Sequence, residues 1–179
     1  PVRAVDDIKC LTTDEQQRFM EVAKRSHNYA QYALILETGL RTGEVIGLTW
    51  DAIDWKARTL TVNKTLEFRH KNKCWRAGPP KTEKSYRTIP LTDRAYAVLK
   101  SCYDERDSRK ESDTLSQVLE YMDRRTGRTG TLVMKDLVFI NYRTGEPAKN
   151  SSYDTHLYKL CDEAGIEHFC MHALRHTYA

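Results

Sequence analysis

The sequence predicts a mainly α-helical fold with a small three-stranded antiparallel β-sheet, an α+β class. Two observations predict it: apolar residues recur every three or four positions towards both ends of the chain, and they alternate with polar residues in its middle. The 179 residues suit one domain, and a composition of 40% hydrophobic and 30% charged residues is typical of a globular protein. Residues 1–9 are expected to be the end of an interdomain linker.

Three helices are predicted in the N-terminal part of the chain. A capping-box pattern that begins at Thr12 starts a helix over about 13–25. A second helix, over about 28–38, has one apolar face and is stopped by Gly39. Thr42 is the expected N-cap of a short third helix that follows directly.

The middle of the chain predicts short antiparallel strands. Residues 59–62 alternate between polar and apolar types, and residues 86–89 form the last strand before Pro90. Between them a long basic hairpin is expected, with strands near 66–68 and 74–76. We expect this small sheet to pack on the helical body.

Helical periodicity returns in the C-terminal half. One apolar stripe predicts a helix around 95–102, and the same spacing over 115–122 predicts another. Residues 137–140 are interpreted as a short buried strand or extended segment, and residues 153–164 as an amphipathic helix. The last residues, 171–179, are interpreted as the first turns of a further helix.

The net charge of +4 permits a polyanionic partner, and the distribution of basic residues is more informative. Basic side chains outnumber acidic ones between positions 64 and 87, a pattern expected for contact with a phosphate backbone. A solvated face is the alternative explanation, and it is the preferred one for a second cluster, Arg124, Arg125 and Arg128. The candidate DNA-contacting residues are Arg69, Lys71, Lys73, Arg76, Lys84 and Arg87.

Composition disfavours several classes of protein. No apolar run approaches the roughly 20 residues of a membrane span, so no membrane partner is expected. The first residues do not resemble a signal peptide. The five cysteines form no C-x-x-C pair, which favours a reducing compartment, such as the cytoplasm, over a disulfide framework.

The strongest candidate site lies near the C-terminus. His172, Arg175 and His176 occupy helix positions i, i+3 and i+4 and therefore share one face. The arrangement suits an oxyanion, because an arginine fork matches phosphate and an imidazole can donate a hydrogen bond or move a proton. A zinc pair is the alternative. However, Ala173 stands where an H-E-x-x-H metallopeptidase has glutamate, and no third ligand is obvious, so we expect no metal or other cofactor.

Arg41 is the second candidate. It lies between the stop of one helix and the start of the next, where free N–H groups and the helix dipole favour an anion. Glu44, one turn further on, could pair with Arg41 and fix its orientation. A simple surface ion pair between the two is the alternative.

Lys81 is the third candidate. It follows Pro79-Pro80 and precedes the last predicted strand, so it should lie at a turn or sheet edge. A lysine there can reach a bound phosphodiester as a flexible proton donor. A solvated-turn role is the alternative, since Lys84 is close by.

These residues together resemble the tyrosine recombinase (phage-type integrase) family. Within that family, they are similar to the integrases of conjugative transposons. Thr38–Glu44 resembles the family's first arginine box, and Pro80-Lys81-Thr82 resembles its β-hairpin lysine. His172-Ala173-Leu174-Arg175-His176 resembles its H-x-x-R-H box. The resemblance covers nearly the whole chain, in the family's order and approximate spacing.

The resemblance implies a catalytic-domain fold and a function in site-specific cleavage and rejoining of DNA. A tyrosine would attack the scissile phosphodiester and form a covalent 3′-phosphotyrosyl link, without ATP or metal. The implied context is integration and excision of a mobile element by a cytoplasmic, nucleoid-associated protein of bacterial or phage origin. On its double-stranded DNA site the protein would form a homo-oligomer, from dimer to tetramer.

The resemblance also implies a role for each site residue. Arg41 and Arg175 would hold the non-bridging oxygens and stabilise the transition state. Lys81 would protonate the leaving 5′-oxygen, and His172 would hydrogen-bond the phosphate or assist proton transfer. Glu44 and His176 would support these groups.

The sequence departs from the family's pattern at its end. The family has a further histidine or tryptophan box after H-x-x-R-H and then the nucleophilic tyrosine. Residues 1–179 are therefore expected to be a catalytic domain that lacks its nucleophile segment. Tyr178 lies too close to Arg175 to replace it, and its four-residue spacing from Leu174 predicts core packing. The rival functions are type IB topoisomerase-like relaxation and DNA binding without catalysis.

Overall fold

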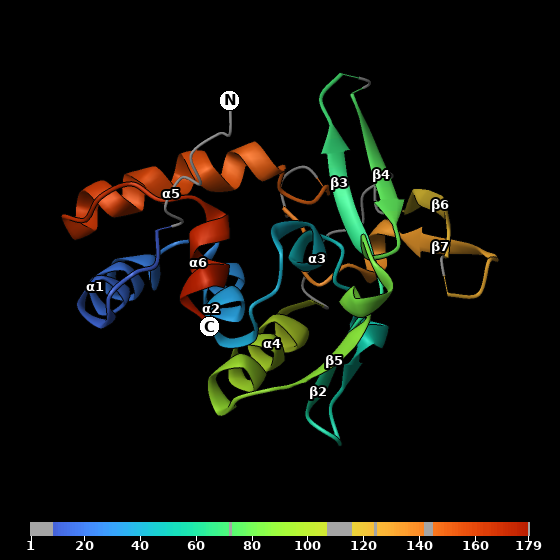
Figure 1. The fold of residues 1–179 in the computed structure, drawn as a ribbon, viewed down its shortest axis with the longest axis horizontal. Helices are drawn as coiled ribbons and strands as arrows, with labels where there is room; N and C mark the ends of the chain where they lie inside the picture. The colour runs from blue at the N-terminus through green and yellow to red at the C-terminus, as the bar shows by residue number, and fades with distance from the viewer. Residues whose placement is uncertain (1–8, 72, 107–115, 124, 142–144, 179) are drawn as a thin grey trace, which may run out of the picture.

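The computed structural model describes residues 9–71, 73–106, 116–123, 125–141 and 145–178. Figure 1 shows α1, α2, α5 and α6 grouped on one side of the molecule and the paired strands on the other. The predicted mixture of helices and small antiparallel sheets is confirmed. The helices are α1 (Thr13–Ala23), α2 (Tyr29–Thr38), α3 (Thr42–Ile46), α4 (Asp93–Glu105), α5 (Asn150–Ala164) and α6 (Met171–Thr177). The strands are β1 (Ile53–Asp54), β2 (Thr59–Val62), β3 (Thr65–Arg69), β4 (Cys74–Gly78), β5 (Arg87–Pro90), β6 (Val118–Met122) and β7 (Thr129–Val133).

Local capping chemistry explains where the helices begin and end. The Thr12 hydroxyl accepts a hydrogen bond from the Glu15 amide at 3.2 Å, which confirms the predicted capping box of α1. Gly39 ends α2 with a left-handed φ of 62°. The prediction that Thr42 is the N-cap of α3 is wrong by one residue. Arg41 is the N-cap, because the Glu44 carboxylate reaches back to its amide.

The core is centred on α2, which is covered by other elements on most of its faces. Tyr32, Leu34 and Ile35 in this helix are completely buried. The ring of Phe19 in α1 contacts that of Tyr32 edge-on, with centroids 5.6 Å apart. Since α2 packs against both α4 and α6, it holds the C-terminal helix close to the start of α3.

In the described part of the chain, the strands form three separate sheets. β1, β2 and β5 make a three-stranded antiparallel sheet in which Leu60 pairs with Ile89. The basic hairpin, β3 and β4, is a two-stranded sheet of its own, and Figure 1 shows it extending beyond the body. Gly47 permits this arrangement, because a Cβ there would lie 2.7 Å from the backbone nitrogen of Leu66. The chain that leaves α3 can therefore pass directly against the root of the hairpin.

The predicted helix over 115–122 is wrong. Residue 115 lies outside the described residues, and Val118–Met122 is strand β6, paired with β7 through Leu119 and Leu132. A spacing of four places residues on one face of a strand as well as of a helix, so Val118 and Met122 fit both. Leu119 decides between them, because it faces inward against β7 while Val118 and Met122 are exposed.

Candidate functional site

Glu44 is the buried centre of the candidate site, with only 2% of its side chain exposed. Oε1 accepts from Arg41 Nη1 at 2.9 Å and from Arg87 Nη1 at 3.1 Å. Oε2 accepts from Arg87 Nη2 at 2.8 Å and from the Arg41 amide at 2.9 Å. Burial by itself raises the pKa of Glu44, but the hydrogen bonds from Arg87 and Arg41 outweigh it and lower the pKa below its ordinary value.

Arg175 reaches this region from α6. Its Nη1 donates a hydrogen bond to the carbonyl of Gly39, the residue that ends α2. Two residues later the chain reaches Arg41, so one carbonyl links the helix of Arg175 to the start of α3. This bond uses one N–H of the guanidinium, and no other residue in the described part of the chain accepts a hydrogen bond from the remaining ones.

The site carries an excess of positive charge. Burial first, and then the charge of Arg41, lowers the pKa of Arg175, while Glu44 acts in the opposite direction and Arg87 lowers it further. Three guanidinium groups therefore surround one carboxylate, which leaves two positive charges in excess. Because 44% of the Arg41 side chain is exposed, this charge is accessible to an anion from solvent.

His172 and His176 lie on the same face of α6, as predicted from their spacing. Their ring centroids are 4.5 Å apart. Burial first, and then the positive charges of His176, Arg175 and Arg41, lowers the pKa of the exposed His172. His172 is therefore mostly neutral at pH 7. The Nε2 of His176 is buried and makes no hydrogen bond within the described residues.

Lys81 lies on the exposed segment between β4 and β5. The next residue, Thr82, is linked through its hydroxyl to Ser85 Oγ at 2.9 Å. Ser85 Oγ in turn accepts from Arg41 Nη1 at 3.5 Å, so the Lys81 segment is tied to the site through Ser85.

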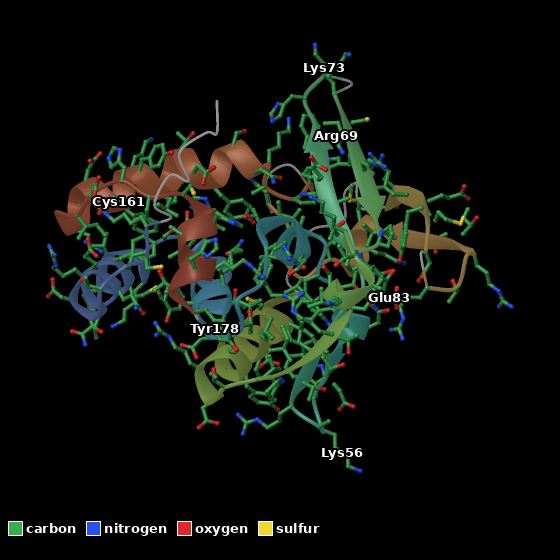
Figure 2. All side chains as sticks on the ribbon, in the orientation of Figure 1. Lys56, Arg69, Lys73, Glu83, Cys161 and Tyr178 are labelled. Atoms are coloured by element: carbon green, nitrogen blue, oxygen red, sulfur yellow. The ribbon has the colours of Figure 1, made fainter. Side chains whose placement is uncertain are left out.

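The basic hairpin has one apolar and one polar face. Phe68 and Trp75 pair across the strands on the inner face, with ring centroids 5.2 Å apart. Figure 2 shows Lys73 at the tip of the hairpin, far from the helices. The other candidate DNA contacts on this ribbon, Arg69, Lys71 and Arg76, are exposed, as is Lys84 after it. Arg87 differs, since its guanidinium is engaged with Glu44 and only 26% of its side chain is exposed.

The arginine cluster at 124–128 is only partly described. Arg124 lies outside the described residues, and Arg125 and Arg128 are exposed near the turn between β6 and β7. Arg125 lies over the ring of Tyr86, with 5.0 Å from its guanidinium carbon to the ring centroid.

The prediction that Tyr178 packs in the core is wrong. Its side chain is 51% exposed, and its ring lies over Gly39 rather than inside the molecule. The spacing from Leu174 does not place the two side chains together in the core. Tyr178 follows the last residue of α6, and its ring is accommodated by the missing side chain at Gly39.

A sequence profile of the phage integrase family matches residues 9–179. The chain belongs to the phage integrase family. It is 28% identical, over 97% of its length, to a protein named tyrosine recombinase XerC-like from Caldanaerobacter subterraneus subsp. tengcongensis. It is 27% identical, over 94% of its length, to the transposase of transposon Tn916 from Enterococcus faecalis. It spans 43% and 39% of those two proteins, and the resemblance to tyrosine recombinases is confirmed.

Solved structures of similar fold agree with this membership of the phage integrase family. The Tn1549 transposon integrase, solved in complex with circular intermediate DNA, superposes with a TM-score of 0.73 at 20% identity. That match covers 95% of this chain and 52% of the other. The XerA recombinase superposes with a TM-score of 0.66 at 22% identity, over 99% of this chain and 50% of the other. Both likenesses show that the fold is that of a tyrosine recombinase catalytic domain.

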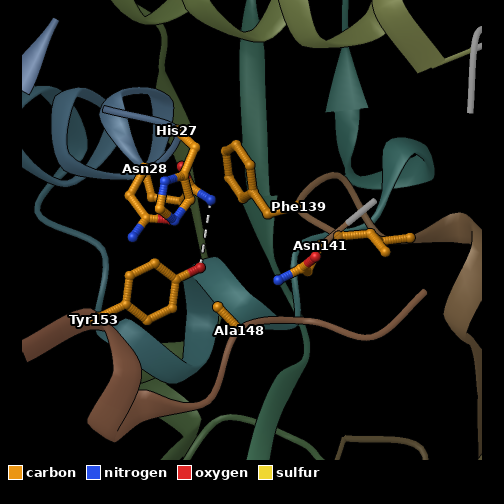
Figure 3. A pocket seen from close by; sticks show the side chains of 8 residues that line it. His27, Asn28, Phe139, Asn141, Ala148 and Tyr153 are labelled. Carbon is orange, nitrogen blue, oxygen red and sulfur yellow. Dashed lines mark hydrogen bonds between the residues drawn. The ribbon is translucent and has the colours of Figure 1, made fainter. Parts of the chain in front are cut away.

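The integrase-family domain also contains a pocket that the sequence did not reveal (Figure 3). Its volume is about 420 Å³, and its lining comes from the start of α2, from Phe139–Asn141 and from the start of α5. Figure 3 shows Tyr153 and Phe139 on two of its walls. None of Arg41, Lys81, His172 and Arg175 lines it. Its residues come from three distant segments, and no sequence pattern marks them.

Within the described ranges, no three histidine, cysteine, aspartate or glutamate side chains converge as metal ligands would. Among the helices of the described part, none has the length and apolar character needed to cross a membrane.

Two partners of the catalytic candidates, the Gly39 carbonyl and Ser85, were not predicted from the sequence. Neither residue type by itself indicates such a contact.

Proposed function

We propose that the protein cleaves and rejoins DNA strands at a specific site through a covalent 3′-phosphotyrosyl intermediate, in the integration and excision of a mobile element. One observation carries the proposal: Arg41 and Arg175, from elements far apart in sequence, gather with His172 around a solvent-accessible site that has two excess positive charges. A phosphodiester is the anion that this set of donors fits best.

We propose that the two arginines stabilise the negative charge that develops on the phosphate in the transition state. Arg41 is oriented by Glu44 and Arg175 by the Gly39 carbonyl, so neither has to reorganise when a phosphate binds. The neutral His172 can donate a hydrogen bond to a phosphate oxygen or accept a proton. His176 supports it through the contact of their rings.

Lys81 is proposed as the general acid that protonates the leaving 5′-oxygen. Its segment is tied to Arg41 by Thr82 and Ser85, which supports a place beside the same phosphate.

The nucleophile is proposed to be a tyrosine outside residues 1–179. Tyr178 is a poor candidate, because it follows Arg175 by less than one helical turn and its ring lies on Gly39. A separate tyrosine would attack the phosphorus, and a 5′-hydroxyl of a second strand would later displace it, so that no external energy source is needed.

Double-stranded DNA at a recombination site is the proposed substrate, and a homo-oligomer on that DNA is the proposed active assembly. The exposed residues Arg69, Lys71, Lys73, Arg76 and Lys84 are proposed to contact phosphates, which position a protein without reading sequence. The Tn1549 integrase, similar in fold, was solved with DNA, which supports this partner.

A suicide-substrate assay tests the function. The product of the whole gene, incubated with a nicked DNA that carries the element's end, should become covalently attached to DNA. A protein that binds DNA without catalysis would never form the adduct. Relaxation of supercoiled plasmids that lack any cognate site would instead favour a topoisomerase-like function.

A further inference from the structure

We infer that Arg87 is a positioning residue that orients Arg41 through Glu44, rather than a residue that contacts DNA. The inference rests on the proposed function, since Arg41 is there assigned to the phosphate. Arg87 also connects the Lys81 segment to Arg41, because both arginines hydrogen-bond to Ser85.

Several hydrogen bonds occupy the guanidinium of Arg87. Its two terminal nitrogens donate to the two oxygens of Glu44, the planar fork that binds a carboxylate most specifically. Nη1 also donates to the carbonyl of Ser85 at 3.1 Å. A guanidinium used in this way, with 26% of its side chain exposed, has little capacity left for a DNA phosphate.

Arg87 also fixes the orientation of the Glu44 carboxylate. A carboxylate with 2% exposure has to be fully hydrogen-bonded, because an unpaired buried charge is costly. The fork of Arg87 fixes the plane of the carboxylate. That plane decides where Oε1 lies, and Oε1 holds Nη1 of Arg41. Arg41 is the more exposed of the two arginines, at 44%, so its orientation depends on this anchored oxygen and on the longer contact with Ser85 Oγ at 3.5 Å.

Arg87 also contacts the segment that carries Lys81, through Ser85. Ser85 is 5% exposed, and its carbonyl accepts from Arg87 while its hydroxyl accepts from Arg41. The same hydroxyl contacts Thr82, the neighbour of Lys81. Arg87 therefore holds both Glu44 and the turn through which the proposed general acid is attached.

Cleavage kinetics on the whole gene product separate positioning from DNA contact. Arg87→Lys keeps the charge but loses the fork, and it should lower the cleavage rate at saturating DNA by about tenfold or more, as misplacement of a catalytic group does. Its DNA dissociation constant should stay within about twofold of wild type, a change of only ~0.4 kcal/mol. If Arg87 contacted DNA, the reverse would hold: binding would be weaker and the cleavage rate at saturating DNA unchanged. The slope of log affinity against log salt concentration would fall by about the contribution of one phosphate contact.

A matched control is available in Arg58→Lys. Arg58 is a second arginine near a strand end whose guanidinium is paired with a carboxylate, that of Asp93 at 2.6 Å. It has no role in the proposed site, so its replacement should leave both rate and affinity unchanged.

A second measurement does not depend on catalysis. In nitrogen-15 NMR spectra of the 179-residue chain, the Nη groups of Arg41 should rotate slowly in the wild type, and faster in Arg87→Lys. If Arg87→Lys does not fold, Arg87→Gln, which keeps an N–H donor for Glu44 but loses the fork, replaces it in the same measurement. Unchanged Arg41 rotation in the folded variant would overturn the inference. A wild-type protein that forms no adduct with DNA would overturn the proposed function, while the NMR result would still decide the role of Arg87.

Discussion

Arg175 and Gly39 meet across the junction of α6 and α2, where Nη1 of the arginine donates to the glycine carbonyl. The residues are 136 positions apart in the chain. Because Gly39 also begins the path to Arg41, this one contact sets the two proposed phosphate-binding arginines in relation to each other.

Replacing either arginine should remove catalysis while preserving most DNA binding. Arg41→Ala and Arg175→Ala are each expected to lower the cleavage rate by about 10²–10³, the usual cost of losing one transition-state donor. Adduct formation on a nicked site and a gel-shift titration measure the two properties. Binding that fell in parallel with cleavage would argue against a transition-state role.

Gly39→Ala should destabilise the protein more than a glycine substitution with the same backbone geometry elsewhere. At Gly39 the left-handed φ costs about 1–2 kcal/mol for alanine, and the new Cβ would lie 2.5 Å from the Tyr178 ring. Gly127 is the matched control, because its φ is 64° and no atom lies within 4 Å of its Cβ position. Urea unfolding of both variants measures the difference, and equal losses would show that the Tyr178 contact is not formed.

Glu44 should make stability depend on pH in the acid range. Its folded-state pKa is lowered from 4.5, so its contribution is complete above that value and is lost as the pH falls through the lower folded pKa. Unfolding free energies between about pH 6 and pH 3 should therefore decrease, and Glu44→Gln should flatten part of that decrease. If the unfolding free energy of Glu44→Gln fell with pH as steeply as that of the wild type, Glu44 would not be the source of the pH dependence.

The pKa of His172 should rise when a neighbouring positive charge is removed. Burial, His176, Arg175 and Arg41 together hold this pKa below 6.5. Arg41→Gln removes one of these charges, so an NMR titration of the His172 ring should show a higher pKa than in the wild type. Arg58→Gln, which removes a positive charge outside the candidate site, serves as the control. An unshifted His172 in Arg41→Gln would mean that the two groups do not approach each other in solution.

The hairpin tip should contribute to DNA affinity through electrostatics. Replacing Lys71 and Lys73 with glutamine should weaken binding and reduce the salt dependence of affinity by about two phosphate contacts. Lys56→Gln is a suitable control, because Figure 2 shows Lys56 at a loop at the opposite end of the molecule. Equal binding by the two variants would leave the hairpin without a DNA role.

The sequence by itself determined most helices and the catalytic candidates. The capping box at Thr12, the stop at Gly39 and the apolar stripe of α4 act within a few residues, so local patterns suffice to predict them. The motifs around Arg41 and Arg175 were recognisable for the same reason.

Only the tertiary structure decided what each of these groups contacts. Whether 118–122 is a strand depended on β7, since a four-residue spacing fits both kinds of element. The fork of Arg87 on Glu44 and the bond from Arg175 to Gly39 join residues that lie 43 and 136 positions apart. Such pairings depend on how helices and strands pack, and no local pattern in the sequence contains that information.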